Sequence, residues 1–122
     1  TRFMSVRGLG DVYKRQVRKA DGRVIGVISL MDAERAVPGW ELGIEMAPDV
    51  RRQGYAREAL AAVIQAFFEK TDTVLFTVGN AYNTISGELL KKLGFTYEGI
   101  EHKAMRHAER GPTDLVCYYL EK

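Results

Sequence analysis

The chain has 122 residues, of which 46% are hydrophobic and 28% are charged, and its formal net charge is +2. Such a length suits one domain with a modest core, and such a composition is ordinary for a globular protein. The small charge, with basic and acidic residues mixed along the chain, argues against a nucleic-acid-binding module. The longest apolar stretch, 59–68, is interrupted by Gln65, which argues against a membrane span.

Residues 1–16 (TRFMSVRGLGDVYKRQ) are basic, contain glycine and show little periodicity. We interpret them as an atypical N-terminal segment, which is either a genuine loop leading into a strand or sequence foreign to the domain, because DVYKRQ resembles translated adapter sequence. The domain itself is predicted over 17–122. The segment has no signal-peptide pattern and Cys117 is the single cysteine, so we expect a cytoplasmic protein with no internal disulfide and no bound metal.

From Val17 onward the pattern predicts three strands. An Ala-Asp-Gly turn between apolar runs indicates a hairpin, with one strand ending near residue 19 and the next covering 23–31. A third strand is predicted over 40–46, with its apolar residues on one face and its glutamates on the other. Gly43 inside this strand indicates a bulge or a close approach of another group.

The second half alternates helices and strands. Apolar residues recur at helical spacing over 57–70, and a short β-branched run over 73–78 predicts a buried strand. A second helix is predicted over 83–93, stopped by Gly94. Two closing strands follow over 95–100 and 115–120, joined by a polar loop that contains Gly111-Pro112. This order predicts an α/β or α+β sheet with at least one crossover.

The segment PDVRRQGYA leads from the third strand directly into the first helix. The first amides of a helix lack internal partners and carry the positive end of its dipole. Gly54 and Ala56 leave room for a ligand near these amides, and Arg51 and Arg52 add positive charge. The segment therefore predicts a pyrophosphate-binding loop, with a basic solvated loop that merely begins a helix as the alternative.

The residues Arg51-Arg52-Gln53-Gly54-Tyr55-Ala56 resemble the Arg/Gln-x-x-Gly-x-Gly/Ala signature of the GNAT superfamily of N-acetyltransferases. Asn83-Thr84-Ile85-Ser86, followed by Lys92-Leu93-Gly94-Phe95, resembles the pattern of that superfamily's RimJ/RimL-like branch. The resemblance covers roughly 17–122. It implies the acyl-CoA N-acyltransferase fold, a mixed and mostly antiparallel sheet with two main helices, truncated here so that its first strand and the helices preceding the hairpin are lacking.

The resemblance also implies how acetyl-CoA is held. The amides of the loop hold its pyrophosphate with help from the arginine side chains, and Asn83 contacts it near the thioester. The backbone of Ile44 and Met46 pairs with the pantetheine arm, which enters between the strand 40–46 and the strand 73–78. The loop residues concerned are Arg51, Arg52, Gln53, Gly54, Tyr55 and Ala56.

The implied chemistry is direct attack of an amine on the acetyl thioester, which needs a base for the amine and a fixed donor for the developing oxyanion. Glu41 and Glu45 are the candidate bases; Glu41 lies farther from the pyrophosphate end, and the alternative is that both are surface carboxylates. Ser86 matches the acid of the RimJ/RimL-like branch. Many relatives use a tyrosine at the position of Leu90, so Tyr82 stays a second candidate acid, and Ser86 could instead be a helix cap.

Two functions are compatible with these residues. The first is an N-acetyltransferase acting on a primary amine, either a protein N-terminus or a small amine. The second is a CoA-binding remnant or regulatory module without turnover. Expected partners are acetyl-CoA and the amine acceptor, with neither nucleic acid nor membrane; apolar surface left by missing helices would also favour oligomers.

Overall fold

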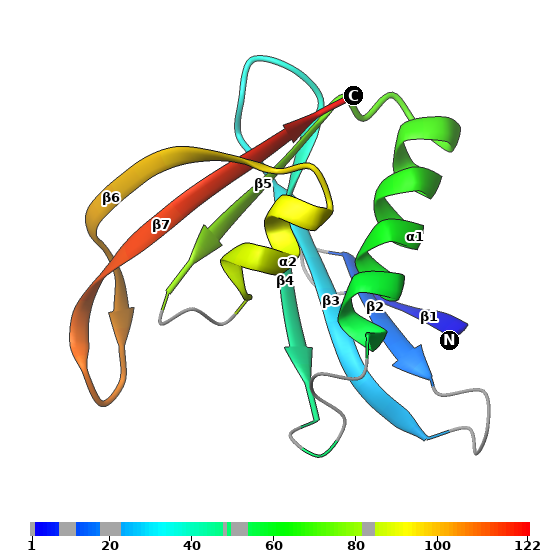
Figure 1. The fold of residues 1–122 in the computed structure, drawn as a ribbon, viewed down its shortest axis with the longest axis horizontal. Coiled ribbons are helices and arrows are strands. Elements are labelled where there is room, and N and C mark those ends of the chain that lie inside the picture. The colour runs from blue at the N-terminus through cyan, green and yellow to red at the C-terminus, as the bar shows by residue number, and fades with distance from the viewer. Residues whose placement is uncertain (1, 8–11, 18–22, 48, 50–53, 82–84) are drawn as a thin grey trace.

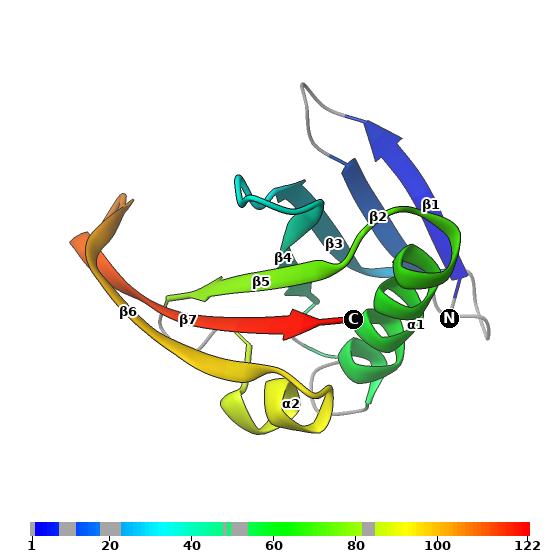
Figure 2. The ribbon, with the colours of Figure 1, turned by 90° about the horizontal axis from the view of Figure 1, so that it is seen from above.

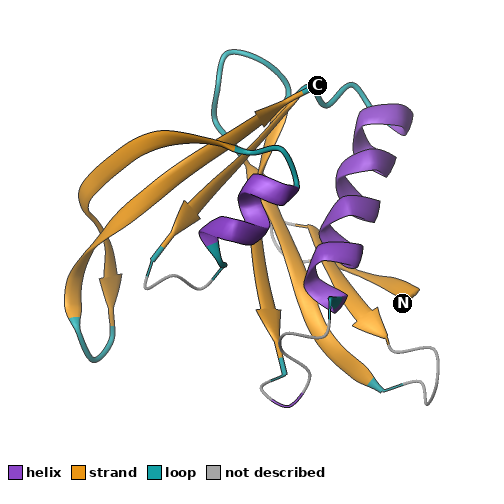
Figure 3. Cartoon of the chain, viewed as in Figure 1, coloured by secondary structure: helices purple, strands orange, loops and turns teal. Residues whose placement is uncertain are grey.

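The chain folds around a mixed sheet in a computed structural model, which describes every residue except 1, 8–11, 18–22, 48, 50–53 and 82–84 (Figures 1 and 3). None of the described helices is long and apolar enough to cross a membrane. The strands are β1 (Arg2–Arg7), β2 (Val12–Val17), β3 (Val24–Asp32), β4 (Gly39–Met46), β5 (Leu75–Asn80), β6 (Thr96–His107) and β7 (Gly111–Glu121), and the helices are α1 (Tyr55–Lys70) and α2 (Gly87–Lys92).

The described strands form one seven-stranded sheet in the order β1-β2-β3-β4-β5-β7-β6. Neighbouring strands pair antiparallel, except β4 and β5, which are parallel. A parallel pair needs a crossover connection, and α1 provides it. The predicted mixed, mostly antiparallel sheet with two main helices is therefore confirmed.

The largest departure from prediction lies before residue 17. The first strand was expected to be lacking, but β1 and β2 form an antiparallel hairpin, and β2 pairs in turn with β3. That part of the prediction is wrong, because backbone pairing at a sheet edge does not require the regular apolar alternation that the segment lacks. Only residues 8–11 separate β1 from β2, and both described helices follow β4. The domain boundary at residue 17 stays a prediction.

The helices differ from prediction mainly at their beginnings. α1 begins at Tyr55, two residues before the predicted start, because the chain turns directly from Gly54 into the helix. α2 covers Gly87–Lys92, so the prediction is wrong for residues 85 and 86, which precede the helix. The predicted start at residue 83 lies outside the described residues. The predicted stop at Gly94 is confirmed: its φ is 96°, and its N–H donates to a carbonyl in the last turn of the helix at 3.0 Å.

β6 and β7 form a hairpin that is longer than predicted. Gly111 and Pro112 lie at the start of β7 rather than in the connecting loop. Polar residues dominate the distal part of β6, which conceals the strand from a search for apolar runs. The pairing is also irregular, with register shifts between Tyr97 and Gly99 and between Glu101 and Met105.

Both helices pack on one face of the sheet, which we call the helix-covered face (Figure 2). α1 directs a stripe of apolar residues at helical spacing toward alternate residues of the strands. Phe76 of β5 is fully buried there, with its ring 5.1 Å from that of Phe68 and 6.1 Å from that of Phe67. The contiguous core consists of Ile28, Leu30, Leu42, Ile44, Ala59, Leu60, Val63, Ile64, Phe76, Val78, Ile85, Leu90 and Phe95.

Candidate active site

The two parallel strands separate soon after they meet. β4 and β5 pair at three positions, the last of which joins Glu41 and Thr77, and no further pairing between them occurs among the described residues. β4 nevertheless continues to Met46 along β3, and β5 continues to Asn80 along β7. Figure 1 shows the ends of the two strands diverging. The sheet is therefore split along one edge of β4.

Residues at the closed end of the split leave no room for larger side chains. A Cβ added to Gly39 would lie 2.8 Å from the backbone oxygen of Leu75, so the two strands are in close contact at their first pair.

Gly43 lies farther along β4, where the pairing with β3 shows no bulge. It faces Ser29, whose Oγ would lie 2.6 Å from a Cβ added to Gly43. Of the two readings of this glycine, close approach is correct and the bulge is not.

The split leaves one backbone edge of β4 facing β5. The Ala47 N–H donates to the Ile25 carbonyl at 2.8 Å, which shows which residues of β4 bond to β3. Because these groups alternate along an antiparallel pair, the N–H and C=O of Ile44 and Met46 are directed to the other edge, toward the split. An extended chain in the split can therefore pair with β4 as a strand would.

The helix α1 begins at the open end of β4, across the loop 47–54. Gly54 precedes the helix with a φ of 81°, and its carbonyl accepts a hydrogen bond from the Glu58 N–H at 3.1 Å. No atom lies within 4 Å of a Cβ built on Gly54, so its left-handed backbone, and not crowding within the described residues, favours glycine. Tyr55 and Ala56 form the first turn, whereas the predicted Arg51, Arg52 and Gln53 lie outside the described residues.

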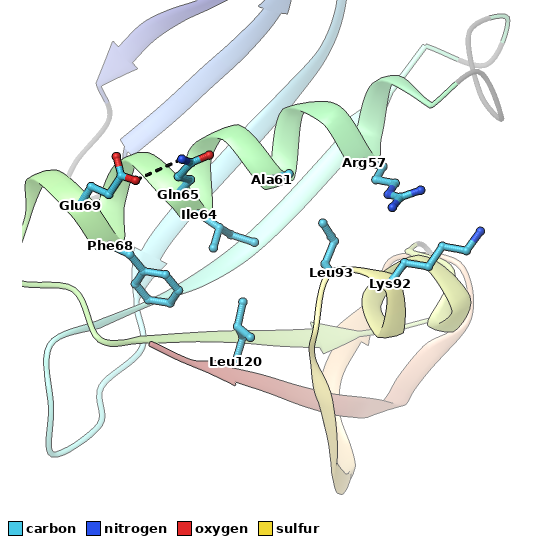
Figure 4. Close-up of a pocket in the computed structure, with 9 residues that line it drawn as sticks. All are labelled: Arg57, Ala61, Ile64, Gln65, Phe68, Glu69, Lys92, Leu93 and Leu120. Carbon is cyan, nitrogen blue, oxygen red and sulfur yellow. Dashed lines mark hydrogen bonds between the residues drawn. The ribbon is translucent and has the colours of Figure 1, made fainter.

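A groove of 540 Å³ runs between α1, the end of α2 and the end of β7 (Figure 4). Ala61, Ile64 and Leu93 contribute to its apolar part. Arg57 and Lys92 lie near one another at the end of the groove closest to the start of α1. An apolar floor with cations at one end suits a ligand that carries both a ring or alkyl part and a phosphate. The full lining is Arg57, Ala61, Ile64, Gln65, Phe68, Glu69, Lys92, Leu93 and Leu120.

The other face of the sheet has no described helix over it, and we call it the open face. Glu41 is half-buried there, and its Oε1 would lie 3.3 Å from a Cβ added to Gly79, so the carboxylate lies over β5. Burial raises the pKa of Glu41, the nearby charge of Glu101 raises it further, and Arg35 opposes the rise. The open face includes Ser29, Glu41, Gly43, Thr77, Gly79, Leu115, Cys117 and Tyr119.

Of the two candidate bases, Glu41 has the more suitable surroundings. It stands where the split begins and is partly shielded from water. Glu45 lies on the same face of β4 but is exposed. A carboxylate with a raised pKa accepts a proton more readily near neutral pH, so these surroundings suit a proton acceptor.

Ser86 stands at the start of α2, on the helix-covered side of the sheet. Its carbonyl accepts a hydrogen bond from the Leu90 N–H at 3.1 Å, but its exposed side chain makes no capping hydrogen bond. The hydroxyl is therefore not used as a helix cap. Leu90, at the position where the resemblance implies a tyrosine in many members, is fully buried, whereas Tyr82 and Asn83 lie outside the described residues.

Two residues near Ser86 were missed in the sequence. Asn80 is buried at the end of β5; its Nδ2 donates to the Ile85 carbonyl at 2.6 Å and its Oδ1 accepts from the Ile85 N–H at 3.1 Å. The Tyr118 hydroxyl would lie 3.2 Å from a Cβ added to Gly87, so it reaches the first turn of α2. An asparagine directly after an apolar run was the available signal for Asn80; no sequence pattern connected Tyr118 to α2.

A mixed sheet that splits between two parallel strands, with a glycine turn and a helix start near its open end, is the architecture of the acyl-CoA-binding acyltransferases. The family model described as the acetyltransferase (GNAT) domain matches residues 3–96. The chain therefore belongs to the GNAT acetyltransferase family, whose members use acetyl-CoA. The match includes most of β1 and all of β2.

Solved structures show the same fold. A ribosomal-protein-S5-alanine acetyltransferase from Vibrio fischeri superposes with a TM-score of 0.82 at 20% identity, over 92% of this chain and 62% of that one. A spermidine N-acetyltransferase SpeG chimera from Vibrio cholerae and hSSAT gives 0.79 at 18% identity, over 92% and 68%. A dodecameric spermidine N-acetyltransferase from Vibrio cholerae gives 0.78 at 18%, over 92% and 65%. No protein of curated function matches the chain in sequence.

Proposed function

We propose that this chain is an N-acetyltransferase that transfers an acetyl group from acetyl-CoA to a primary amine by direct attack. The observation that carries the proposal is the split between β4 and β5, into which the backbone groups of Ile44 and Met46 are directed. The split leads toward the start of α1 at Gly54 and Tyr55. Membership of the GNAT family supports the same conclusion.

In this proposal the cofactor lies along the split with its pyrophosphate at the start of α1. The amides of Gly54, Tyr55 and Ala56 meet the phosphates, because they stand at the positive end of the α1 dipole. Arg51, Arg52 and Gln53 extend this cradle and Asn83 contacts the thioester end. Ile44 and Met46 pair with the pantetheine amides along the free edge of β4.

Glu41 acts as the base in this proposal. A protonated amine cannot attack, and a half-buried carboxylate at the closed end of the split is placed to take its proton, directly or through water. A backbone N–H on the free edge of β4 stabilises the charge that develops on the thioester oxygen. The departing thiolate takes a proton from Ser86, which precedes α2, or from Tyr118 of β7, whose hydroxyl reaches the first turn of α2.

The acceptor is proposed only as a class, a protein N-terminus or a small amine, as in the RimJ/RimL-like branch. Two of the structural neighbours are named for an alanine of a ribosomal protein and for spermidine, which are examples of these two kinds of amine. We propose a cytoplasmic location, and we keep association of copies as part of the proposal because one neighbour is a dodecamer. The second candidate is a CoA-binding module without turnover, favoured by the open face, over which no described helix builds an acceptor site.

Calorimetric titration with acetyl-CoA tests the proposal first. We expect a Kd of roughly micromolar size for the wild type, and loss of binding in the Arg52→Glu, Gly54→Asp double variant. Arg106→Glu makes the same charge change as the Arg52→Glu part of that variant, on an exposed residue of β6, and serves as the control. Release of free thiol in the presence of amine acceptors then separates the enzyme from the binding module. A folded wild type that does not bind acetyl-CoA would contradict both functions.

A further inference from the structure

An ion pair crosses the open face beside Glu41. Arg35 lies in the connection 33–38 between β3 and β4, and Glu98 lies in β6. The Arg35 Nη2 donates to Glu98 Oε1 at 2.9 Å and its Nη1 donates to Oε2 at 3.4 Å, so both guanidinium nitrogens face the carboxylate. The hydrogen bond to Glu98 raises the pKa of Arg35, and the same bond lowers the pKa of Glu98.

The pair spans an unusual distance in the sheet. β5 and β7 lie between β4 and β6, so three strand spacings, about 14 Å, separate the outer two strands. A guanidinium from the β3–β4 connection reaches β6 only if the connection overhangs the sheet. Figure 2 shows this connection bent over β5 on the side away from the helices, and the far end of the β6–β7 hairpin curves toward the same side.

The connection that carries Arg35 is closed and internally bonded. Its ends are joined by a hydrogen bond from the Ala33 N–H to the Gly39 carbonyl at 3.2 Å. The Glu34 N–H donates to Asp32 Oδ1 at 2.7 Å, and Glu34 has a φ of 54°, which is left-handed and uncommon for a residue other than glycine. This residue immediately precedes Arg35, so an uncommon backbone conformation, held by a hydrogen bond, determines the direction of the Arg35 side chain.

Glu98, the partner of Arg35, also lies at a backbone irregularity. The register of β6 against β7 shifts between Tyr97 and Gly99, so Glu98 is the extra residue of a bulge. Gly99 has a φ of 141°, a backbone angle that residues other than glycine rarely adopt. Bulges redirect side chains and are frequent beside active sites. Two independent departures from regular backbone therefore meet in one ion pair.

Glu41 stands two residues after Gly39, where the connection ends, and several charged groups act on it. They are Arg35 and Glu34 of the connection and Glu101 of β6. The charge of Glu41 in turn raises the pKa of Cys117 in β7. The neighbouring strand β5 contains no titratable residue among its described positions. Arg35 is the one cation in this set, because Glu34, Glu41, Glu98 and Glu101 are all carboxylates.

We propose that Arg35 is a positioning residue for acetyl transfer: tethered by Glu98, it holds the β3–β4 connection over the open face and keeps a positive charge beside the carboxylate of Glu41. This inference rests on the proposed function of Glu41 as base. It assigns to Arg35 no contact with the reacting atoms. The proposal also explains the bulge at Glu98, which strand pairing alone does not require.

The pH profile of kcat/KM tests the proposal in Arg35→Met, which keeps the apolar stem and removes the cation. Without Arg35 the pKa of Glu41 rises, so the acidic limb of the profile moves to higher pH and kcat/KM falls on that limb. The Kd for acetyl-CoA stays within about twofold, because the cofactor cradle is elsewhere. Arg35→Lys restores most of the profile, and Arg106→Met, the matched loss of a cation from β6, leaves it unchanged.

A second readout does not depend on turnover. The side-chain ¹³C carboxyl signal of Glu41 is titrated by NMR in the wild type, in Arg35→Met and in Glu98→Gln. We expect the Glu41 pKa to move upward in Arg35→Met and to change in Glu98→Gln, where Arg35 loses its tether. We expect no change in Arg106→Met or in Glu121→Gln, an exposed carboxylate on β7. Identical Glu41 titrations in all five proteins overturn the inference. Absence of acetyl transfer by the wild type, with a Glu41 titration that still responds to Arg35, contradicts the proposed function alone.

Discussion

The two faces of one sheet differ in what holds them together. On the helix-covered face, Phe76 and Val78 of β5 belong to a contiguous core with α1 and α2. On the open face, Thr77 and Gly79 of the same strand are neighbours of a half-buried carboxylate and a half-buried cysteine, Cys117. Packing therefore concentrates stability on one face, and the other face is left to charge and hydrogen-bonding chemistry. The predictions below test this division in order of expected effect.

The largest effect is expected from truncating the covered face. Phe76→Ala removes a fully buried ring that contacts two other rings, and we expect a loss of about 3–5 kcal/mol in the free energy of unfolding. Leu115→Ala, on the open face, should cost about 1 kcal/mol because Leu115 is only half-buried. Urea denaturation measures both. Equal losses would show that the faces are packed alike.

Asn80 connects the two halves of the comparison, since it is buried beside the core and holds the segment that precedes Ser86. Asn80→Ala leaves the Ile85 N–H and carbonyl without these partners, and we expect a loss of about 2–3 kcal/mol together with weaker binding of acetyl-CoA. Denaturation and calorimetry report the two effects. As a control, Gln65→Ala removes an exposed hydrogen bond to Glu69 and should cost less than about 0.5 kcal/mol.

Gly43 tests how closely the open face is packed. Gly43→Ala places a Cβ against the Ser29 hydroxyl, and we expect a loss of about 1–3 kcal/mol in the free energy of unfolding. The same substitution in a Ser29→Gly background should cost much less, because the colliding oxygen is absent. A double-mutant cycle by denaturation measures the coupling. Additive losses would mean that backbone strain, and not Ser29, requires the glycine.

The smallest effect on stability is expected from Glu41. Its pKa is raised in the folded state, so the folded chain binds this proton more tightly, and stability falls as pH rises above the ordinary carboxyl pKa. Glu41→Gln should therefore slightly stabilise the fold at neutral pH, and this gain should vanish in acid. Activity should fall by about a hundredfold or more if Glu41 is the base. Denaturation at several pH values measures the stability and an acetyl-transfer assay measures the activity, with Glu45→Gln as control. A destabilising Glu41→Gln would contradict the assignment of burial as the cause.

Local signals in the sequence were sufficient for most of the covered face. The stripe of α1, the stop at Gly94 and the apolar run of β5 each lie within one element, so propensity and periodicity predict them directly. The edge strand β1 was missed because its pairing depends on a neighbour, β2, and not on its own pattern, whereas the predicted hairpin at the Ala-Asp-Gly turn corresponds to β2 and β3. The polar distal part of the β6–β7 hairpin was missed for the same reason.

By itself, the sequence determined the class of fold, the membership of a cofactor-binding family and the loop that leads into α1, because these reside in short contiguous patterns such as RRQGYA. Only the tertiary structure decided where the sheet splits, that Glu41 lies over Gly79, that Tyr118 reaches the start of α2, and that Arg35 meets Glu98. Each of these joins residues far apart in the chain, and the joining groups depend on strand order and on local backbone irregularities. The pairing of strands throughout the sheet determines which side chains become neighbours on the open face.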